Sequence, residues 1–255
     1  MKLSVSITTF NGEPLVRRCV ASVAWADEII VVDSGSTDHT RDICRELGAK
    51  VTQTADFPGY GQQKNRALDR AGGDWVLALD HDEWVSAELR TEIEATIRNP
   101  GDAVAFTMPR LSNFCGRDMR HAGWWPDPVT RLFRKGAARF SEDHLHDRIL
   151  VTGKIGKLHH PLRHEPMPTL EHVITKMNGY SSAGAKFNFE NGKQASLGKA
   201  VFHGGWAFVR TYFLQAGFLD GREGFMLSVS NAEGTYYRYL KLMMLGGTSR
   251  REIDD

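Results

Sequence analysis

The first eighty residues alternate between two hydrophobic patterns. Leu3, Val5 and Ile7 alternate with polar residues, which predicts a strand with one apolar and one polar face. Apolar residues at helical spacing follow Pro14, whose fixed backbone angle suits the first turn of a helix. The predicted elements are a strand over 2–7, a helix over 14–23, a strand over 28–33, a helix around 43–47, a strand over 50–54, a helix over 61–71 and a strand over 74–79.

Repeated strand–helix units with short links predict a mostly parallel, doubly wound α/β sheet of Rossmann-like type. Asp33 ends the second strand and Asp80 follows the fourth. Open α/β sheets bind ligands beyond the carboxyl ends of their strands. We therefore predict a nucleotide site at this edge of the sheet.

Asp80, His81 and Asp82 follow the apolar run 76–79 directly. In extended chain, side chains two residues apart point the same way, so the two carboxylates can share one site. Two like charges in a cleft are unfavourable unless a cation lies beside them, and Mg²⁺ or Mn²⁺ suits oxygen ligands. The alternative is a solvated strand end without a metal.

Four segments, in order, carry a family resemblance: residues 6–11, 30–38, 61–67 and 80–83. With them the chain resembles the inverting family 2 glycosyltransferases of GT-A fold. The resemblance implies that the first segment contacts the uracil of a UDP-sugar and that Asp80 and Asp82 form the metal-binding Asp-x-Asp motif. The similarity covers nearly all of the chain, and its main motifs lie within residues 3–84.

Three later segments, 124–127 with 131–134, 145–147 and 217–221, resemble the branch that contains lipopolysaccharide-core β-glucosyltransferases. The chain departs from the family pattern at three positions. His81 replaces a small residue between the aspartates, Gly12 stands where an acidic residue commonly follows the Asn, and Asp147 stands where a Glu is expected.

Candidate roles on the donor side follow from the chemistry of a nucleoside diphosphate sugar. Asp33 can accept a hydrogen bond from a ribose hydroxyl or the uracil imide, and Phe10 can offer its ring to the base. Lys64 can add a point charge beside the diphosphate, although a solvated helix charge is the alternative. The predicted nucleotide-sugar-binding residues are Thr9, Phe10, Asn11, Asp33, Ser36, Lys64 and Asp80.

Inversion by direct displacement requires one general base on the acceptor side. The resemblance favours Asp147, with Asp143 and Glu142 as alternatives. Trp125 and Asp127 are the predicted acceptor-binding residues, because an aromatic face packs well on a sugar ring.

The predicted metal ligands are Asp80 and Asp82, joined by one histidine, His164 or His146. A zinc site is the weaker alternative, because structural zinc prefers Cys/His sets at defined spacings and the cysteines at 19, 44 and 115 are scattered.

Composition narrows the class of protein and of partner. A chain of 255 residues with a net charge of +1 has no strong field that would attract nucleic acid. Met1 and Lys2 lead directly into the first strand, so we expect no signal peptide and a cytoplasmic location, peripheral on the inner face of the cell membrane.

The last third, residues 166–255, is helical and rich in aromatic and basic residues, which suits a membrane interface or a homodimer contact. We therefore expect a catalytic domain over 1–165, with a nucleotide-sugar half at 1–100 and an acceptor half at 101–165. The helical region 166–255 follows it.

The sequence thus predicts metal-dependent, inverting transfer of a hexose, with glucose favoured, from a UDP-sugar to a glycolipid of the lipopolysaccharide core. Two alternatives remain open at this point. One is a phosphatase of haloacid-dehalogenase type, whose Asp-x-Asp would stand on the first strand rather than the fourth. The other is a module that binds sugar nucleotides without catalysis.

Overall fold

The computed structural model describes residues 1–141 and 148–251, with side chains as far as residue 247. The chain forms two compact units. Unit 1 comprises Met1–Leu111 and Asp127–His164, and unit 2 comprises Ser112–Pro126 and the chain from Glu165 onward.

The core of unit 1 is a parallel sheet in the order β3-β2-β1-β4. Its strands are β1 (Leu3–Thr9), β2 (Glu28–Asp33), β3 (Lys50–Gln53) and β4 (Trp75–Asp80), which confirms the four predicted strands. In the register of the ladders, Thr9 lies opposite Asp33 and Thr8 lies opposite Asp80. Asp33 ends β2 and Asp80 ends β4. Both strands pair with β1, so the two aspartates lie at the same edge of the sheet.

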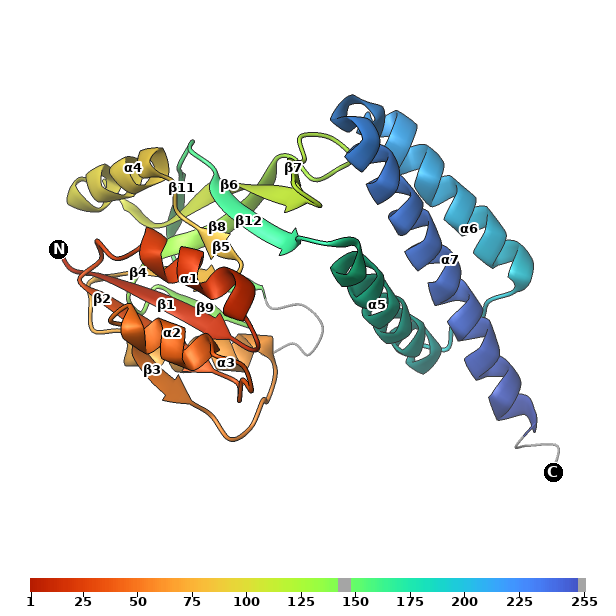
Figure 1. The fold of residues 1–255 in the computed structure, drawn as a ribbon, viewed down its shortest axis with the longest axis horizontal. Helices are drawn as coiled ribbons and strands as arrows, with labels where there is room; N and C mark the ends of the chain where they lie inside the picture. Colours follow the sequence, from red (N-terminus) through yellow and green to blue (C-terminus); the bar gives the residue numbers. More distant parts are fainter. Residues whose placement is uncertain (142–147, 252–255) are drawn as a thin grey trace. The chain divides into compact units, whose positions relative to one another are not determined.

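Helices cover both faces of this sheet (Figure 1). They are α1 (Glu13–Ser22), α2 (Thr40–Glu46), α3 (Tyr60–Arg70) and α4 (Ala87–Arg98). Side chains alternate between the faces along each strand, so Val31 packs in the cluster formed with α1, α2 and α4, whereas Ile30 packs in the cluster formed with α3. The doubly wound arrangement is thus confirmed.

Beyond β4 the sheet continues in the order β8-β6-β12-β5. These strands are β5 (Glu83–Trp84), β6 (Ala103–Phe114), β8 (Asp127–Arg134) and β12 (Leu162–Met167). The β4–β8, β6–β8 and β5–β12 pairs are antiparallel, and β11 (Lys154–Lys157) pairs with β6 in parallel. β9 (Ala138–Phe140) and β10 (Ile149–Val151) form a separate antiparallel pair.

Unit 2 is built mainly of helices. They are α5 (Leu170–Glu190), α6 (Leu197–Val209), the π-helix η1 (Arg210–Leu214), the 3-10 helix η2 (Gly217–Asp220) and α7 (Gly221–Arg251). α7 packs against both α5 and α6, which lie on either side of it in Figure 1. In the described part of the chain, no helix has the length and apolar content needed to cross a bilayer.

Residues 112–126, which the sequence analysis placed in the catalytic domain, belong to unit 2. Inside this segment, β7 (Arg117–Asp118) pairs with the end of β6. The segment is joined to the rest of unit 2 by the buried Asp220 carboxylate, which accepts hydrogen bonds from the backbone N–H groups of Arg120 and His121. A charged group buried this deeply is held by such bonds, so they fix the segment to η2.

Candidate active site

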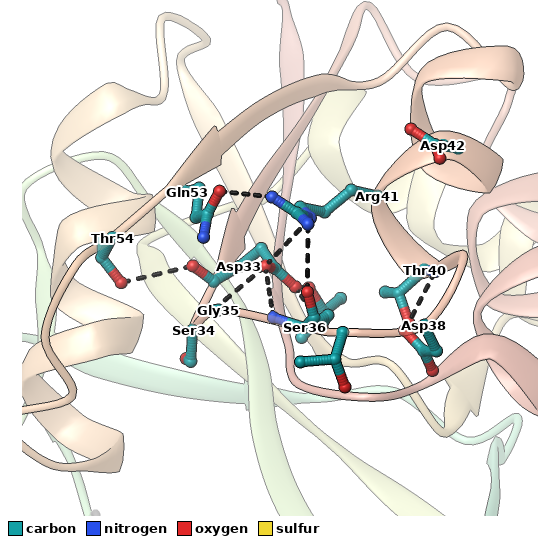
Figure 2. A network of polar contacts seen from close by, with 12 residues as sticks. Asp33, Ser34, Gly35, Ser36, Asp38, Thr40, Arg41, Asp42, Gln53 and Thr54 are labelled. Carbon is teal, nitrogen blue, oxygen red and sulfur yellow. Dashed lines mark hydrogen bonds and ion pairs between the residues drawn. The ribbon is translucent and has the colours of Figure 1, made fainter.

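Asp33 organises the loop that follows β2 (Figure 2). The carboxylate is fully buried and accepts hydrogen bonds from Thr9 Oγ1 at 2.9 Å, from Ser36 N at 2.9 Å and from Gly35 N at 3.1 Å. Arg41 Nε lies 3.7 Å from Asp33 Oδ1. Gly35 has a φ of 92°, a left-handed angle that suits glycine, so the loop can fold back over the carboxylate. The buried Asp33 carboxylate therefore fixes the conformation of the loop that follows β2.

The loop after β1 joins this network and leaves one aromatic ring in solvent. Asn11 N donates to Ser36 Oγ at 2.8 Å, and Asn11 Oδ1 accepts from Thr37 N at 2.9 Å. Phe10 is 57% exposed beside these bonded residues. A rigid loop with an exposed ring suits contact with a flat base.

Asp80 is held between two cations. Lys64 Nζ lies 2.9 Å from its Oδ1, and Arg131 Nη2 lies 2.7 Å from its Oδ2. Burial by itself would raise the pKa of Asp80, but the positive charges of Lys64 and Arg131 outweigh burial and hold that pKa far below its usual range. The Asp80 carboxylate is therefore ionised at neutral pH, and the positive charges of Lys64 and Arg131 balance its negative charge.

Behind Asp80 lies a buried ion network that the sequence analysis missed. The fully buried Glu83 carboxylate contacts Arg131 Nη2 at 2.7 Å and Arg110 Nη1 at 3.2 Å, and it accepts from Asp80 N at 3.0 Å. Arg110 also pairs with Asp127 at 2.7 Å. Burial alone would lower the pKa of Arg131, yet Glu83 and Asp80 raise it well above its usual value. The network holds the Asp80 backbone in place.

Asp82 faces the predicted histidine. The β5–β12 ladder places His164 opposite Glu83, and His164 Nε2 lies 3.6 Å from Asp82 Oδ2. This separation exceeds a hydrogen bond. Burial would raise the pKa of Asp82, but His164 outweighs burial and lowers it. Of the candidate ligands, Asp82 and His164 are thus brought together, whereas Asp80 points to Lys64 and Arg131.

A carboxylate oxygen and an imidazole nitrogen at this separation fit a divalent ion such as Mn²⁺ or Mg²⁺. Within residues 1–141 and 148–251, no group of three or more His, Cys, Asp or Glu side chains gathers closely enough to form a complete metal cage. Mg²⁺ is commonly bound through one or two protein ligands, with water and substrate phosphates filling the other positions. The residues present fit that pattern.

Two departures from the family pattern meet in the structure. A Cβ atom added to Gly12 would lie 2.5 Å from Cδ2 of His81, closer than real Cβ contacts allow. The His81 ring therefore occupies the space that a side chain at position 12 would need. Gly12 N also donates to Thr40 Oγ1 at 2.8 Å, which fixes the loop against α2.

The candidates on the acceptor side divide between the units. Asp127 belongs to unit 1, where Arg110 binds it, and Trp125 belongs to unit 2, where the Arg120 guanidinium lies 5.4 Å from its ring centroid. The candidate bases Glu142, Asp143 and Asp147, together with His146, lie outside the described residues.

In unit 1, loops and charged groups gather at the carboxyl edge of the parallel strands β3-β2-β1-β4, as in nucleotide-binding α/β enzymes. Residues 4–152, more than half of the chain, match the family model for glycosyl transferase family 2. The chain therefore belongs to glycosyl transferase family 2. This membership confirms the family resemblance and removes the support for a phosphatase.

Full-length relatives carry related names. An uncharacterised glycosyltransferase of Rickettsia prowazekii is 33% identical, over 99% of this chain and 90% of its own length. The lipopolysaccharide core biosynthesis glycosyltransferase LpsC of Rhizobium meliloti is 26% identical, over 100% of this chain and 97% of its own length. The crystal structure of S. aureus TarS 1-349 in complex with UDP-GlcNAc is 18% identical, with a TM-score of 0.50 over 92% of this chain and 80% of that chain. It is similar in fold, of the GT-A type.

Proposed function

We propose that this glycosyltransferase moves a hexose, glucose in the favoured case, from a UDP-sugar to a glycolipid of the lipopolysaccharide-core type, with inversion and with Mn²⁺ or Mg²⁺. One observation carries the proposal. The Asp82–His164 pair lies in the same site as Asp80, which is held by Lys64 and Arg131. A metal position beside fixed positive charge suits a diphosphate leaving group.

The nucleoside would lie against the two loops at the ends of β1 and β2. Phe10 offers its exposed ring to the base, while Asn11 and Ser36 hold each other at 2.8 Å and keep the loop rigid. Thr9 donates a hydrogen bond to Asp33 beneath this loop, at the ends of β1 and β2. The contact of Asp33 with the ribose or the uracil is part of the proposal.

The diphosphate would lie between Lys64 and the metal ligands Asp82 and His164. A bound divalent ion supplies Lewis-acid stabilisation of the charge that develops on the departing phosphate. Asp80 keeps its proposed place as a metal ligand beside Asp82, and it also orients Lys64, whose Nζ lies 2.9 Å from its carboxylate. A lysine held in this way needs no reorganisation when charge develops beside it.

On the acceptor side, the general base would be Asp147, with Asp143 and Glu142 as alternatives, and Trp125 and Asp127 would bind the acceptor. The name of the LpsC relative supports a lipopolysaccharide-core acceptor. We propose that an enzyme with such an acceptor acts at the inner face of the cell membrane, with a homodimer as one possible assembly.

The test is turnover of UDP-glucose with a lipopolysaccharide-core acceptor, in Mn²⁺ or Mg²⁺ and then in EDTA. We expect metal-dependent release of UDP and a product of inverted anomeric configuration, read by nuclear magnetic resonance. Asp82→Asn should lower the rate by about 10²–10³. The matched control is Asp42→Asn on α2, an exposed aspartate paired with Arg45, which should leave the rate unchanged.

Full activity of Asp82→Asn, or activity unaffected by EDTA, would contradict the proposal. Metal-dependent binding of UDP-sugars without turnover across a broad acceptor panel would instead support a non-catalytic binding module.

A further inference from the structure

The helix α6 packs with its small residues inward. Ala200, Gly204, Ala207 and, in the following π-helix, Thr211 are buried, at spacings of four, three and four residues along one face. A Cβ atom added to Gly204 would lie 3.0 Å from Cβ of Tyr236 on α7. The absence of a side chain at this position therefore lets the two helices approach closely.

The opposite face of this segment carries large apolar side chains in solvent. Phe202 is 69% exposed, Trp206 is 49% exposed and Phe213 is 56% exposed. The ring of Tyr212 connects this exposed surface to η2 and α7, because its centroid lies 5.0 Å from that of Phe213, 6.2 Å from that of Phe218 and 5.6 Å from that of Phe225. We call this surface the α6 face, and its members are Leu197, Val201, Phe202, Trp206, Val209, Phe213, Leu214, Phe218, Leu219 and Phe225.

This arrangement is the reverse of an amphipathic helix in water, which buries its large apolar residues and exposes its polar ones. Small residues between helices and large apolar residues facing outward are typical of helices in contact with lipid. α6 has 13 residues, about 20 Å, whereas a spanning helix needs about 20 residues. A helix of this length with such a face suits the plane of a membrane surface rather than a path across it.

The charges around the α6 face indicate which lipid headgroups it would favour. Between Asn191 and Leu219 the sequence contains Lys193, Lys199 and Arg210 and no Asp or Glu. In the stretch that leads on to Phe225, Asp220 is buried and Glu223 pairs with Arg222 at 2.7 Å, so neither acid cancels these three positive charges. All three basic residues are exposed. A positive surface attracts anionic lipid headgroups, whereas the same surface on a second copy of the chain would repel it.

We infer that the α6 face docks the protein on a membrane that contains anionic lipids, with the aromatic side chains at the headgroup boundary. The inference rests on the proposed function where it gives the docking a purpose, since a glycolipid acceptor is presented at such a surface. The docking itself is a binding property and can be measured without any transfer reaction.

The test is sedimentation of the full chain with vesicles of phosphatidylglycerol and phosphatidylcholine, compared with vesicles of phosphatidylcholine alone. We expect binding to the anionic vesicles that weakens as salt is raised. Phe202→Ser and Trp206→Ser should each weaken the partition coefficient on the order of tenfold, because each removes a large apolar side chain. The control is Ile155→Ser on β11, which is 47% exposed and should bind as the wild type does.

Release of UDP in the presence of a detergent-dispersed acceptor separates this inference from the proposed function. The α6-face variants should retain that activity, so loss of vesicle binding with normal turnover supports docking. The inference would be overturned if the wild-type protein did not sediment with anionic vesicles, or if the variants sedimented with them as the wild type does. Self-association in sedimentation equilibrium that the same variants abolish would overturn it too, by assigning the face to a second copy.

Discussion

Replacing Arg131 by methionine should destabilise unit 1 by about 3 kcal/mol. The guanidinium is 8% exposed and contacts two carboxylates at 2.7 Å, those of Asp80 and Glu83. In this variant Asp80 still pairs with Lys64, and Glu83 still pairs with Arg110 at 3.2 Å, so each carboxylate retains one cation. Each lost charge-assisted hydrogen bond contributes about 1.5–3 kcal/mol, and the remaining partners place the total near the lower end of the sum.

The assay is urea unfolding at pH 7.5, with a thermal melt in which about 3 kcal/mol corresponds to about 6–12 °C. The matched control is Arg134→Met on the same strand. Arg134 lies 5.0 Å from the ring of Trp75, a contact that is worth about 0.5–1 kcal/mol. A loss below 1 kcal/mol for Arg131→Met, or equal losses for both variants, would refute the view that this buried ion network stabilises the site.

Three further predictions concern Gly12, Glu28 and Asp147. Gly12→Ala should cost about 1–3 kcal/mol in thermal unfolding, because its Cβ would meet His81 at 2.5 Å, and His81→Gly in the same chain should restore most of that loss; additive losses would contradict the contact. Glu28 has its pKa lowered to about 2, mainly by hydrogen bonds from Lys50 and Ser4, so it stabilises the fold above pH 4.5 and this contribution disappears as the pH falls towards 2. Glu28→Gln should therefore be about 2 kcal/mol less stable at pH 7 and nearly equal to the wild type at pH 2, and a constant difference across that range would exclude the mechanism. Asp147→Asn should retain UDP binding and lose transfer in a coupled UDP-release assay, whereas near-normal activity would move the base role to another acid.

The local pattern of the chain was sufficient to predict the parallel half of the sheet. Each strand and helix of this half lies in one short segment whose period is visible, and parallel connection then brings the ends of β2 and β4 to β1. The positions of Asp33 and Asp80 at one edge follow from that register alone, so the candidate nucleotide site could be placed from the sequence.

The ion network could not be predicted, because its members meet through pairings between distant segments. Arg131 reaches Asp80 through the antiparallel β4–β8 ladder, and Arg110 reaches Glu83 from β6. No periodicity in a single sequence states which strand lies beside which. The available signal was Arg131 beside the apolar pair Leu132 and Phe133, but the sequence analysis gave this arginine no role.

The two remaining differences also come from long-range packing. His164 was one of two candidate histidines, and the β5–β12 ladder is what brings it within 3.6 Å of Asp82. Gly12 and His81 were noted as separate departures, although the structure shows that one makes room for the other.

Calorimetric titration of UDP, with GDP as the control nucleotide, tests the central claim most directly. The account predicts binding of UDP but not GDP, in the micromolar range in Mn²⁺ and lost in EDTA, and weakened in Asp82→Asn. If neither nucleotide binds under either condition, or if both bind equally without metal, the assignment of Asp82 and His164 to a UDP-sugar site is contradicted.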